Sequence, residues 1–407
     1  MADLGVAVLV LAQPESILYA SGAFAGVASF WRQAGAVFLV IPADADAPLA
    51  AVVGDLQAAG FAKASGISDV RSHPIWVEGT ALVPGDVTFD VAAAIVRADR
   101  ASGRPEGFAR PATFDADAAV GLLRNILVDR GLLAGSTPRI GLELGFVPVA
   151  DMPIFERALP NVAWIDASPL VARLRMVKQP AEIERLRIAA ELSTAGMQRL
   201  FAELAEGHDA STLGAIWRAG VDAEAKRQAL SETLSTWAYI SVGPDGFAPG
   251  GPARRGDVVK VDVGCVVGGY SSDGARTAVL GKAAPGQRQV FDALHRAFDA
   301  GLALLRPGRQ LREAHAAATA SMHASGFTTY TRGHFGHSLG ASIWSEEWPF
   351  ISADSEVMVE PGMVLAFETP YYIGGLGGFI IEDQFLITEA GPQAMASMPR
   401  DLIEIAM

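Results

Sequence analysis

One segment of this chain, residues 260–277, constrains its fold more than any other. It reads KVDVGCVVGGYSSDGART and places Asp262 and Asp273 eleven residues apart, with a Gly-Gly pair between two strand-like arms. Gly-Gly between such arms is typical of a β-hairpin. A hairpin of this length brings both carboxylates to one metal centre. The alternative that the pattern leaves open is a hairpin that merely carries an aspartate at its turn.

Three further residues of metal-ligating type follow in the last third of the chain. His337, Glu368 and Glu382 each lie in a strand-like or glycine-rich context. With the two aspartates they make four carboxylates and one imidazole, whose combined charge is costly to bury without metal. Acidic residues occupy 45 positions, so one of them alone would more often be a solvated surface group. As a set, they predict a site for a pair of divalent cations.

Length and hydrophobic pattern predict two domains in an overall α/β (α+β) chain. The 407 residues exceed the usual size of one core, and half of them are hydrophobic. Before about residue 165, strand-like segments alternate with helical ones, as in a small α/β domain. The boundary is expected near residues 165–178, which gives one domain over 1–168 and a catalytic domain over 169–407. The predicted early strands and helix are Val6–Leu11, Ala36–Ile41, Arg139–Leu144 and Ala118–Leu133.

The second half of the chain repeats one order of elements. Two helical patterns and then two strand-like segments occur twice, which predicts a duplicated unit. The first set covers about residues 180–205, 210–228, 258–263 and 276–280. The second set covers about residues 286–306, 310–325, 363–368 and 379–388.

Composition excludes several classes of protein. No apolar run approaches the roughly 20 residues that cross a bilayer, and the N-terminus lacks the basic and apolar segments of a secretory signal, so a soluble cytoplasmic protein is expected. A formal net charge of −13 disfavours binding to nucleic acid or to anionic membranes. Cys265, the single cysteine, permits no intrachain disulfide and is expected to be a small buried residue.

These motifs resemble those of the pita-bread metallopeptidase family, which includes aminopeptidase P, prolidase and methionine aminopeptidase. The resemblance covers nearly the whole length: the N-terminal half looks like the creatinase-type domain, and LRMVKQPAEI (174–183) looks like the family's interdomain signature. Asp262 and Asp273 match the family's two aspartates. The other three residues match within GHSLG (336–340, with His337), AFETP (366–370, with Glu368) and IED (381–383, with Glu382).

The resemblance implies a dinuclear metal site. Asp273 and Glu382 would bridge two metals, Asp262 would chelate one, and His337 with Glu368 would complete the other. Such ligands fit manganese, cobalt, iron or zinc and do not choose among them. The resemblance implies that a metal-activated hydroxide would attack the carbon of a C–N bond and that the nitrogen would leave, with Glu368 as the catalytic proton shuttle. The resemblance also implies a homodimer, and Xaa-Pro dipeptides as the first substrate class.

Some positions that carry family histidines differ in this chain. Peptide-cleaving members have one where this chain has Gly250, a second at Trp344 and a third at Gly333, next to His334. Those histidines bind the peptide carbonyl and the tetrahedral intermediate. One explanation is an alignment shift, in which His334 is the catalytic histidine or Glu346 takes over.

The other explanation is a different substrate. Trp344, with Trp348 and Trp237 or Tyr239, is hypothesised to line an apolar or cation-accepting substrate pocket. For each of these rings, core packing is the alternative. The changed positions, together with Ile380 where the family has an arginine, favour a non-peptide amide or amidine hydrolase, or a lyase of the same fold, as the second functional interpretation.

Two short patterns point to other chemistries and are set aside. GHSLG also fits the elbow of a serine hydrolase, with Ser338 as nucleophile, but no histidine follows Ser338 in the chain. GGLGG (374–378) lacks the Lys-Ser/Thr pair of a phosphate loop and is expected to be a hairpin turn. Retention of all five ligand-type residues argues against the metal-free and binding-only relatives within the resembled family.

Overall fold

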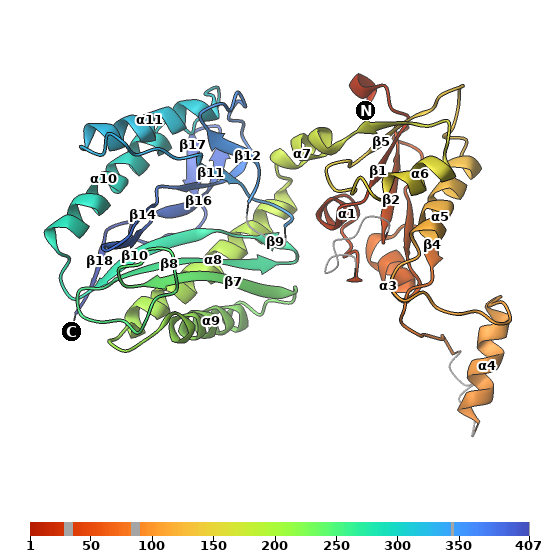
Figure 1. Cartoon of the computed structure of the whole chain (residues 1–407), viewed down its shortest axis with the longest axis horizontal. Helices are drawn as coiled ribbons and strands as arrows, with labels where there is room; N and C mark the ends of the chain where they lie inside the picture. The colour runs from red at the N-terminus through yellow and green to blue at the C-terminus, as the bar shows by residue number, and fades with distance from the viewer. Residues whose placement is uncertain (28–35, 83–89, 343–345, 407) are drawn as a thin grey trace. The chain divides into compact units, whose positions relative to one another are not determined.

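The computed structural model describes residues 1–27, 36–82, 90–342 and 346–406 (Figure 1). They divide into two compact units, Met1–Val171 and Ala172–Met407, each with its own hydrophobic cores. The expected boundary between residues 168 and 169 lies at the first residue of α7 (Ser168–Met176). Among the described residues, every helix is too short or too polar to span a lipid bilayer.

The N-terminal unit is a six-stranded mixed sheet with helices on both faces. Its strand order is β4-β3-β2-β1-β5-β6, in which β1–β2 and β2–β3 are antiparallel and the other pairs are parallel. The strands are β1 (Val8–Leu11), β2 (Phe38–Pro42), β3 (Ala50–Gly54), β4 (Asp69–His73), β5 (Arg139–Leu142) and β6 (Ala163–Asp166). The helices are η1 (Ala2–Leu4), α1 (Pro14–Ser21), α3 (Asp55–Ser65), α4 (Val91–Ala101), α5 (Ala116–Asp129) and α6 (Met152–Ala158).

Both faces of this sheet are buried because successive residues alternate between two cores. On β2, Phe38 and Val40 pack with α5 and α6, whereas Leu39 packs with α1 and α3. The predicted strands and helix are confirmed, with ends shifted by a few residues. The helix begins at Ala116, because the carboxylate of Asp115 accepts a hydrogen bond from the Ala118 N–H and caps it there.

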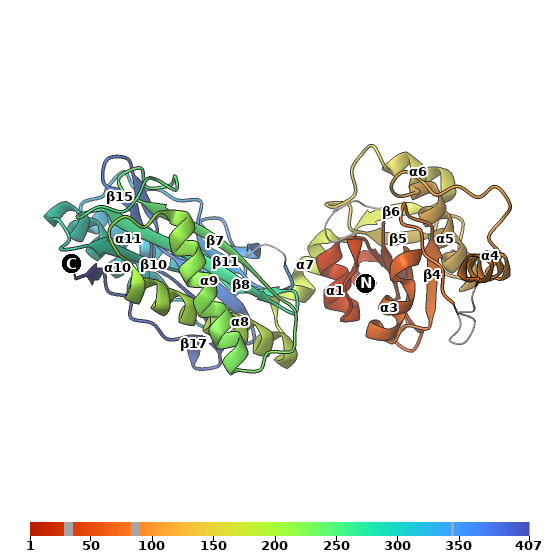
Figure 2. The ribbon, with the colours of Figure 1, turned by 90° about the horizontal axis from the view of Figure 1, so that it is seen from below.

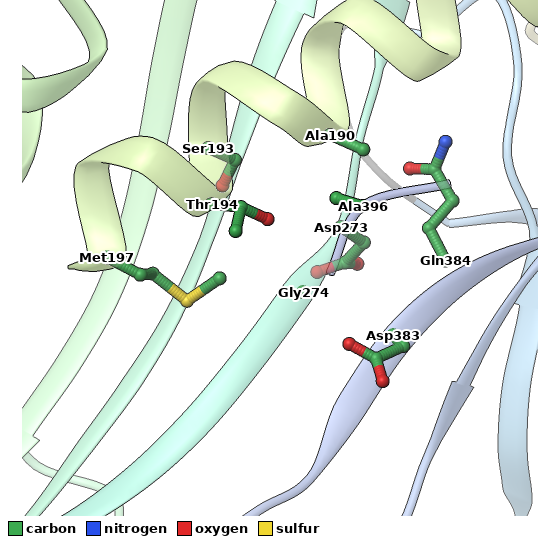
Figure 3. A pocket seen from close by; sticks show the side chains of 9 residues that line it. All are labelled: Ala190, Ser193, Thr194, Met197, Asp273, Gly274, Asp383, Gln384 and Ala396. Atoms are coloured by element: carbon green, nitrogen blue, oxygen red, sulfur yellow. The ribbon is translucent and has the colours of Figure 1, made fainter. Parts of the chain in front are cut away.

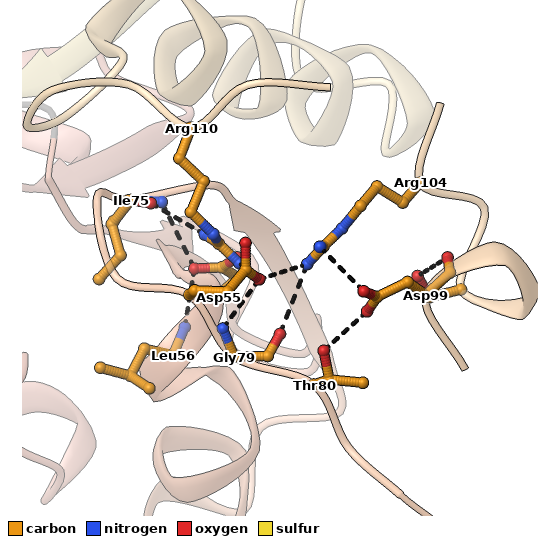
Figure 4. Close-up of polar contacts among 10 residues, drawn as sticks. Asp55, Leu56, Ile75, Gly79, Thr80, Asp99, Arg104 and Arg110 are labelled. Atoms are coloured by element: carbon orange, nitrogen blue, oxygen red, sulfur yellow. Dashed lines mark hydrogen bonds and ion pairs between the residues drawn. The ribbon is translucent and has the colours of Figure 1, made fainter. Parts of the chain in front are cut away.

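A network of charged side chains fixes the segment that follows β4 in this unit (Figure 4). Arg110 donates to Asp55 at the start of α3 and to the Ile75 carbonyl, both at 2.8 Å. Glu78 accepts from Arg110 at 3.2 Å and from Arg104 at 2.7 Å, and these hydrogen bonds lower the pKa of Glu78 to about 2. Asp99 on α4 accepts from Arg104 and Thr80. The segment is therefore held by side chains rather than by a strand ladder.

The C-terminal unit is a curled, mostly antiparallel sheet covered on one face by four helices (Figure 1). The main strand order is β12-β11-β13-β16-β10-β8-β7; β17 pairs with β16, β18 with β10, β9 with β8, and β14 with β15. The helices are α8 (Pro180–Glu203), α9 (Ala210–Arg227), α10 (Pro285–Leu302) and α11 (Leu311–Ala324). The strands are β7 (Leu234–Val242), β8 (Val258–Val267), β9 (Tyr270–Ser271), β10 (Gly274–Leu280), β11 (His334–Ser338), β12 (Glu347–Ser352), β13 (Val364–Glu368), β14 (Tyr371–Ile373), β15 (Gly377–Phe379), β16 (Glu382–Thr388), β17 (Gly391–Ala394) and β18 (Ile403–Ile405).

Two helix pairs cover the two halves of this sheet. Helices α8 and α9 lie over β7, β8 and β10, with Trp217 and Val261 in their common core (Figure 2). Helices α10 and α11 pack on β11, β13 and β16 around Phe298, Phe335 and Phe367. The four predicted helices and the strands predicted over 258–263, 276–280 and 363–368 are confirmed, but each set contains more than the two predicted strands, among them β7, β11 and β12. The predicted strand over 379–388 was wrong in its continuity, because β15 ends at Phe379 and β16 begins at Glu382.

The hairpin predicted around Gly-Gly is confirmed. Val267 lies opposite Tyr270, so Gly268 and Gly269 form a two-residue turn, with φ of 56° and 87°. Positive φ at both central residues is the requirement of a type I′ turn, and glycine meets it without steric cost. GGLGG is likewise a turn, since Ile373 lies opposite Gly377. Cys265 is buried, as expected.

Gly336 is expected to be essential for the pairing of β11 with β13. Its φ is 133°, and a Cβ atom there would lie 2.0 Å from the Ala366 carbonyl oxygen, so Gly336→Ala must both strain the backbone and separate two strands. We expect a loss of about 3 kcal/mol in the free energy of unfolding, measured by urea denaturation.

Gly333→Ala is the matched control, because a Cβ atom there meets nothing within 4 Å. Equal stability of the two variants would contradict the steric argument.

Candidate metal centre

Strand register places three of the predicted ligands in one row across four neighbouring strands. Asp262 on β8 lies opposite Ala275 on β10, and Ala275 also lies opposite Glu382 on β16. Glu382 in turn lies opposite Glu368 on β13. Opposite residues of an antiparallel pair share a face, with Cβ atoms roughly 4.5–5.5 Å apart. The three carboxylates therefore share one face of the sheet, and the small Ala275 leaves space between them.

Asp273 and His337 join this row from neighbouring positions. Asp273 stands two residues before Ala275, and His337 lies opposite Ala366, two residues before Glu368. Residues two apart on a strand share a face. Ligand atoms of Asp273, His337 and Glu382 all lie within 4.8 Å of one another, and all three residues are buried. The structure thus brings the predicted residues together as a three-residue cluster with Asp262 and Glu368 in the same row.

Cationic side chains accompany most of these carboxylates. Lys260 Nζ lies 3.1 Å from Asp262 Oδ2, and His337 Nε2 lies 3.5 Å from Asp273 Oδ2. Arg332 forms an ion pair with Glu368. For Glu382, no cationic side chain of the described residues lies within ion-pair distance. The charge of the row is therefore only partly balanced by the protein.

Burial and the neighbouring charges shift the pKa values of three residues of the cluster. Burial raises the pKa of Asp262 to about 7; Lys260 opposes this shift, whereas the charges of Asp273 and Glu368 add to it. Burial and the same neighbouring charges also raise the pKa of Glu382. Burial alone would lower the pKa of His337, but its hydrogen bond to Asp273 and the charge of that carboxylate raise it to about 9.

His334, predicted as a catalytic residue, lies at the edge of the row. Its Nδ1 is 3.9 Å from Glu368 Oε1, and its Nε2 is 4.0 Å from Glu346 Oε2. The Gly336 N–H donates to Nδ1 at 3.3 Å, so the proton of the neutral ring is assigned to Nε2. Burial lowers the pKa of His334, although Glu368 acts in the opposite direction. The ring is therefore a neutral hydrogen-bond donor at pH 7.

The backbone at Gly250 is incompatible with a histidine. Its φ is 74°, and a Cβ atom there would come 1.8 Å from the Val242 carbonyl oxygen. The Val242 N–H also donates to the Pro249 carbonyl at 3.0 Å, which holds this approach. With this backbone, position 250 cannot carry a histidine side chain without a shift of the loop. Ile380 is buried, and its N–H donates to the Thr277 hydroxyl at 2.8 Å.

The aromatic residues that were predicted to line the substrate pocket differ in their location relative to the carboxylate row. Tyr239 on β7 lies opposite Asp262 and is 43% exposed, so its ring borders the carboxylate row. Trp237 donates from Nε1 to the Ser271 hydroxyl at 3.1 Å, and its ring lies 5.8 Å from that of Tyr239. Trp348 lies on β12. Trp344 falls outside the described residues.

The interdomain signature forms a buried polar network beside His337. Lys178 Nζ donates to the Ser338 hydroxyl at 2.6 Å and to Glu347 at 3.0 Å, and Arg175 binds the same carboxylate at 2.5 Å. A side chain at Gly340 would displace this carboxylate, since a Cβ atom would lie 2.3 Å from Glu347 Oε1. Ser338 is completely buried. It therefore orders the strand after His337 and is no exposed nucleophile.

A small polar cavity lies against Asp273 on the side of α8 (Figure 3). Its volume is about 20 Å³, close to the space of one water molecule. Gln384 projects toward it, and its buried Oε1 has no hydrogen-bond partner among the described residues. The lining residues are Ala190, Ser193, Thr194, Met197, Asp273, Gly274, Asp383, Gln384 and Ala396.

Comparison with known proteins assigns this arrangement to a family. Residues 184–389, just over half of the chain, match the sequence model of metallopeptidase family M24. The chain belongs to this family. The predicted family is thereby confirmed, and an M24 chain is a hydrolase of the metallopeptidase type with an implied divalent metal.

Relatives of this M24 chain include named peptidases. The Xaa-Pro dipeptidase of Pyrococcus furiosus is 29% identical over 234 residues, which cover 58% of this chain and 67% of that protein. The probable dipeptidase PepE of Mycobacterium bovis is 31% identical over 284 residues, 65% of this chain and 73% of that protein.

Solved structures of the same fold match nearly the whole chain. The Xaa-Pro dipeptidase from Bacillus anthracis has a TM-score of 0.75 at 19% identity, covering 99% of this chain and 96% of that one. The X-Pro aminopeptidase from Thermotoga maritima has a TM-score of 0.74 at 17% identity, covering 99% and 97%. At these identities the likeness concerns the fold, and it confirms the predicted pita-bread architecture.

The residues of this M24 chain fit a divalent metal. Ligand atoms of three buried residues converge, and burial together with the neighbouring carboxylates raises the pKa values of Asp262 and Glu382. Carboxylate oxygens with one imidazole are a ligand set for divalent ions. Lys260 and Arg332 were not predicted as site residues. Lys260 stands two residues before Asp262, and Arg332 stands two residues before His334. The two-residue period of a strand would have placed each of them on the face of its predicted neighbour.

The unfolding free energy of the chelated protein is expected to depend on Asp262. Its pKa is about 7 in the folded chain, against 3.8 when unperturbed, so the folded state binds more protons between these values. The contribution of this group to stability is then greatest below pH 3.8, and it is lost as the pH rises through about 7. Between pH 6 and pH 8, the loss from this group is about 1 kcal/mol.

Urea unfolding of EDTA-treated wild-type protein and of Asp262→Asn at the two pH values measures this loss. The variant should lack this part of the pH dependence. Identical pH dependence in both proteins would exclude Asp262 as the group concerned.

Proposed function

We propose that this chain holds two divalent metal ions and hydrolyses the C–N bond of a small substrate, with Xaa-Pro dipeptides as the first substrate class. The observation that carries the proposal is the row of Asp262, Glu382 and Glu368, with Asp273 and His337 beside it, on one buried face of the sheet. The relatives from Pyrococcus furiosus and Bacillus anthracis are named Xaa-Pro dipeptidases, which supports the substrate class.

Each residue of the row has a separate role in this proposal. Asp273 and Glu382 would bridge the two metals, Asp262 would bind one, and His337 with Glu368 would complete the other. Divalent ions in such a site supply a Lewis acid and an acidified water. Manganese, cobalt, iron and zinc all fit these ligands.

The chain's own groups handle the proton and the substrate carbonyl. Glu368 would accept the proton of the attacking water and return it to the leaving nitrogen. Its ion pair with Arg332 holds the carboxylate in place. His334 would donate its Nε2 proton to the carbonyl oxygen, because Nδ1 is already occupied by the Gly336 N–H.

The proposal includes the surroundings of the site. From the family resemblance we infer a homodimer in the cytoplasm, with residues 1–168 as the N-terminal domain and residues 169–407 as the catalytic domain. No nucleic acid or membrane takes part. Trp237, Tyr239 and Trp344 are proposed to border the substrate.

A second function, hydrolysis of a non-peptide amide or amidine, is favoured by one observation. The path of the chain at Gly250 excludes the histidine that peptide-cleaving relatives carry there. Losing one oxyanion donor costs roughly 2.7–4 kcal/mol in the transition state. An amidine, whose tetrahedral intermediate has no carbonyl-derived oxyanion, depends less on this donor than a peptide does.

Metal-dependent turnover tests the proposal. Protein reconstituted with Mn²⁺ should hydrolyse Xaa-Pro dipeptides, and EDTA should abolish the activity. Glu382→Gln removes one bridging charge and should lower kcat/KM by about 100-fold or more. Glu389→Gln, an exposed acid on the same unit, is the control.

Activity that survives chelation would refute the metal proposal. Turnover of small amides or cyclic amidines without turnover of dipeptides would select the second function.

Restoring the family histidine is expected to fail. Gly250→His forces a side chain into contact with the Val242 carbonyl and requires a strained φ, so it should destabilise the protein by about 2 kcal/mol or more. The kcat for dipeptides should not rise.

Thermal unfolding and kinetics of the variant measure both effects. A stable variant with increased kcat would show that the loop can adopt the family's path.

A further inference from the structure

A cavity of about 490 Å³ opens beside His334, on β12 and the loop that follows it. We call it the aromatic-acidic pocket. Its size suits part of a small ligand. Its lining residues are Gly333, His334, Trp348, Phe350, Ser352, Asp354, Ser355, Glu356 and Val357.

The aromatic wall of this pocket follows from strand alternation. Trp348, Phe350 and Ser352 are half-buried on one face of β12, whereas Pro349 and Ile351 are buried on the other. Phe350 lies opposite His337, so this wall shares the face that carries the metal-type residues. The Phe350 ring lies 5.2 Å from the His334 ring. The pocket therefore borders the candidate metal centre at His334, whose Nδ1 lies 3.9 Å from Glu368 Oε1.

The charge of the pocket is negative. Its lining contains two acids, Asp354 and Glu356, and neither lysine nor arginine. Glu356 has Arg312 at 3.5 Å, but among the described residues no lysine or arginine lies within ion-pair distance of Asp354. The Ser352 hydroxyl donates to Asp354 at 2.6 Å and orients the carboxylate.

This combination discriminates between ligand charges. A free carboxylate would meet the carboxylates of Asp354 and Glu356 here and no lysine or arginine of the lining, and like charges repel. A cation would gain from contact with the aromatic rings of Trp348 and Phe350 and from the Asp354 carboxylate. An uncharged alkyl group would gain only from the apolar wall.

We propose that the aromatic-acidic pocket binds a cationic group of the substrate, of the alkylammonium or guanidinium class. The inference rests on the proposed function and narrows its substrate class. Among Xaa-Pro dipeptides, those with lysine or arginine as Xaa are preferred. Among non-peptide amides, those with an alkylammonium group are preferred.

Kinetics on two matched substrates test the proposal. Lys-Pro and norleucyl-Pro differ chiefly by an ammonium group, and Mn²⁺-loaded wild-type protein should show a kcat/KM about three- to tenfold higher for Lys-Pro. Asp354→Asn and Phe350→Leu should each bring this ratio closer to one. Glu360→Gln, an exposed acid outside the pocket, should leave the ratio unchanged.

A ratio near one in the wild-type protein, or a ratio that neither pocket variant changes, overturns the inference while the proposed function stands. If no dipeptide is hydrolysed, the substrate class is wrong, and calorimetry with choline and its uncharged isostere 3,3-dimethylbutanol tests the pocket alone. Tighter binding of choline that Asp354→Asn abolishes supports the cation pocket, and equal binding of the two compounds refutes it.

Discussion

Buried negative charge on one face of the C-terminal sheet is the constraint on which the rest of this structure depends. Asp262, Glu382 and Glu368 lie on the same face because facing residues of antiparallel strands point to the same side of the sheet. Removing carboxylates from water is costly unless positive charge is supplied. Lys260 and Arg332 supply part of it from the protein. The remainder is the physical reason for a divalent metal, and the two helix pairs behind the sheet make the face rigid enough to hold the ligands.

Polar contacts outside the row keep its geometry. Lys178 and Arg175 converge on Glu347 and, through Ser338, on the strand that carries His337. A buried pair of this kind contributes more to specificity than to stability, because desolvation offsets most of its attraction. Here the network acts on position: by holding Ser338 it orders β11 and with it the direction of the His337 side chain.

Much of this architecture could be predicted from sequence, and the exceptions have physical reasons. The hairpin was predictable because Gly-Gly has a local conformational meaning, and the five ligand-type residues were recognisable by their short motifs. The steric reason for glycine at position 250 could not be predicted. The sequence shows that the family histidine is missing, but it does not show that the Val242 carbonyl lies where a histidine Cβ atom would be. Lys260 was overlooked although it stands two residues before Asp262 on the same strand, whereas Arg332 was overlooked because its partner, Glu368, lies on the distant strand β13. The aromatic-acidic pocket depends on which face of β12 is buried, and β12 was not predicted at all.

The distribution of the ligand-type residues along the chain has a consequence for biosynthesis. Asp262 and Asp273 lie near a single hairpin, whereas Glu382 belongs to β16, which follows β10 only after two helices and five strands. At 5–20 residues per second, a ribosome would deliver Glu382 roughly 5–20 s after Asp273. Early in that interval the aspartates lack both His337 and Glu382, and Glu382 is still missing after His337 has been added. In the proposed function, the complete ligand set therefore forms late in synthesis, after the N-terminal unit has had time to fold.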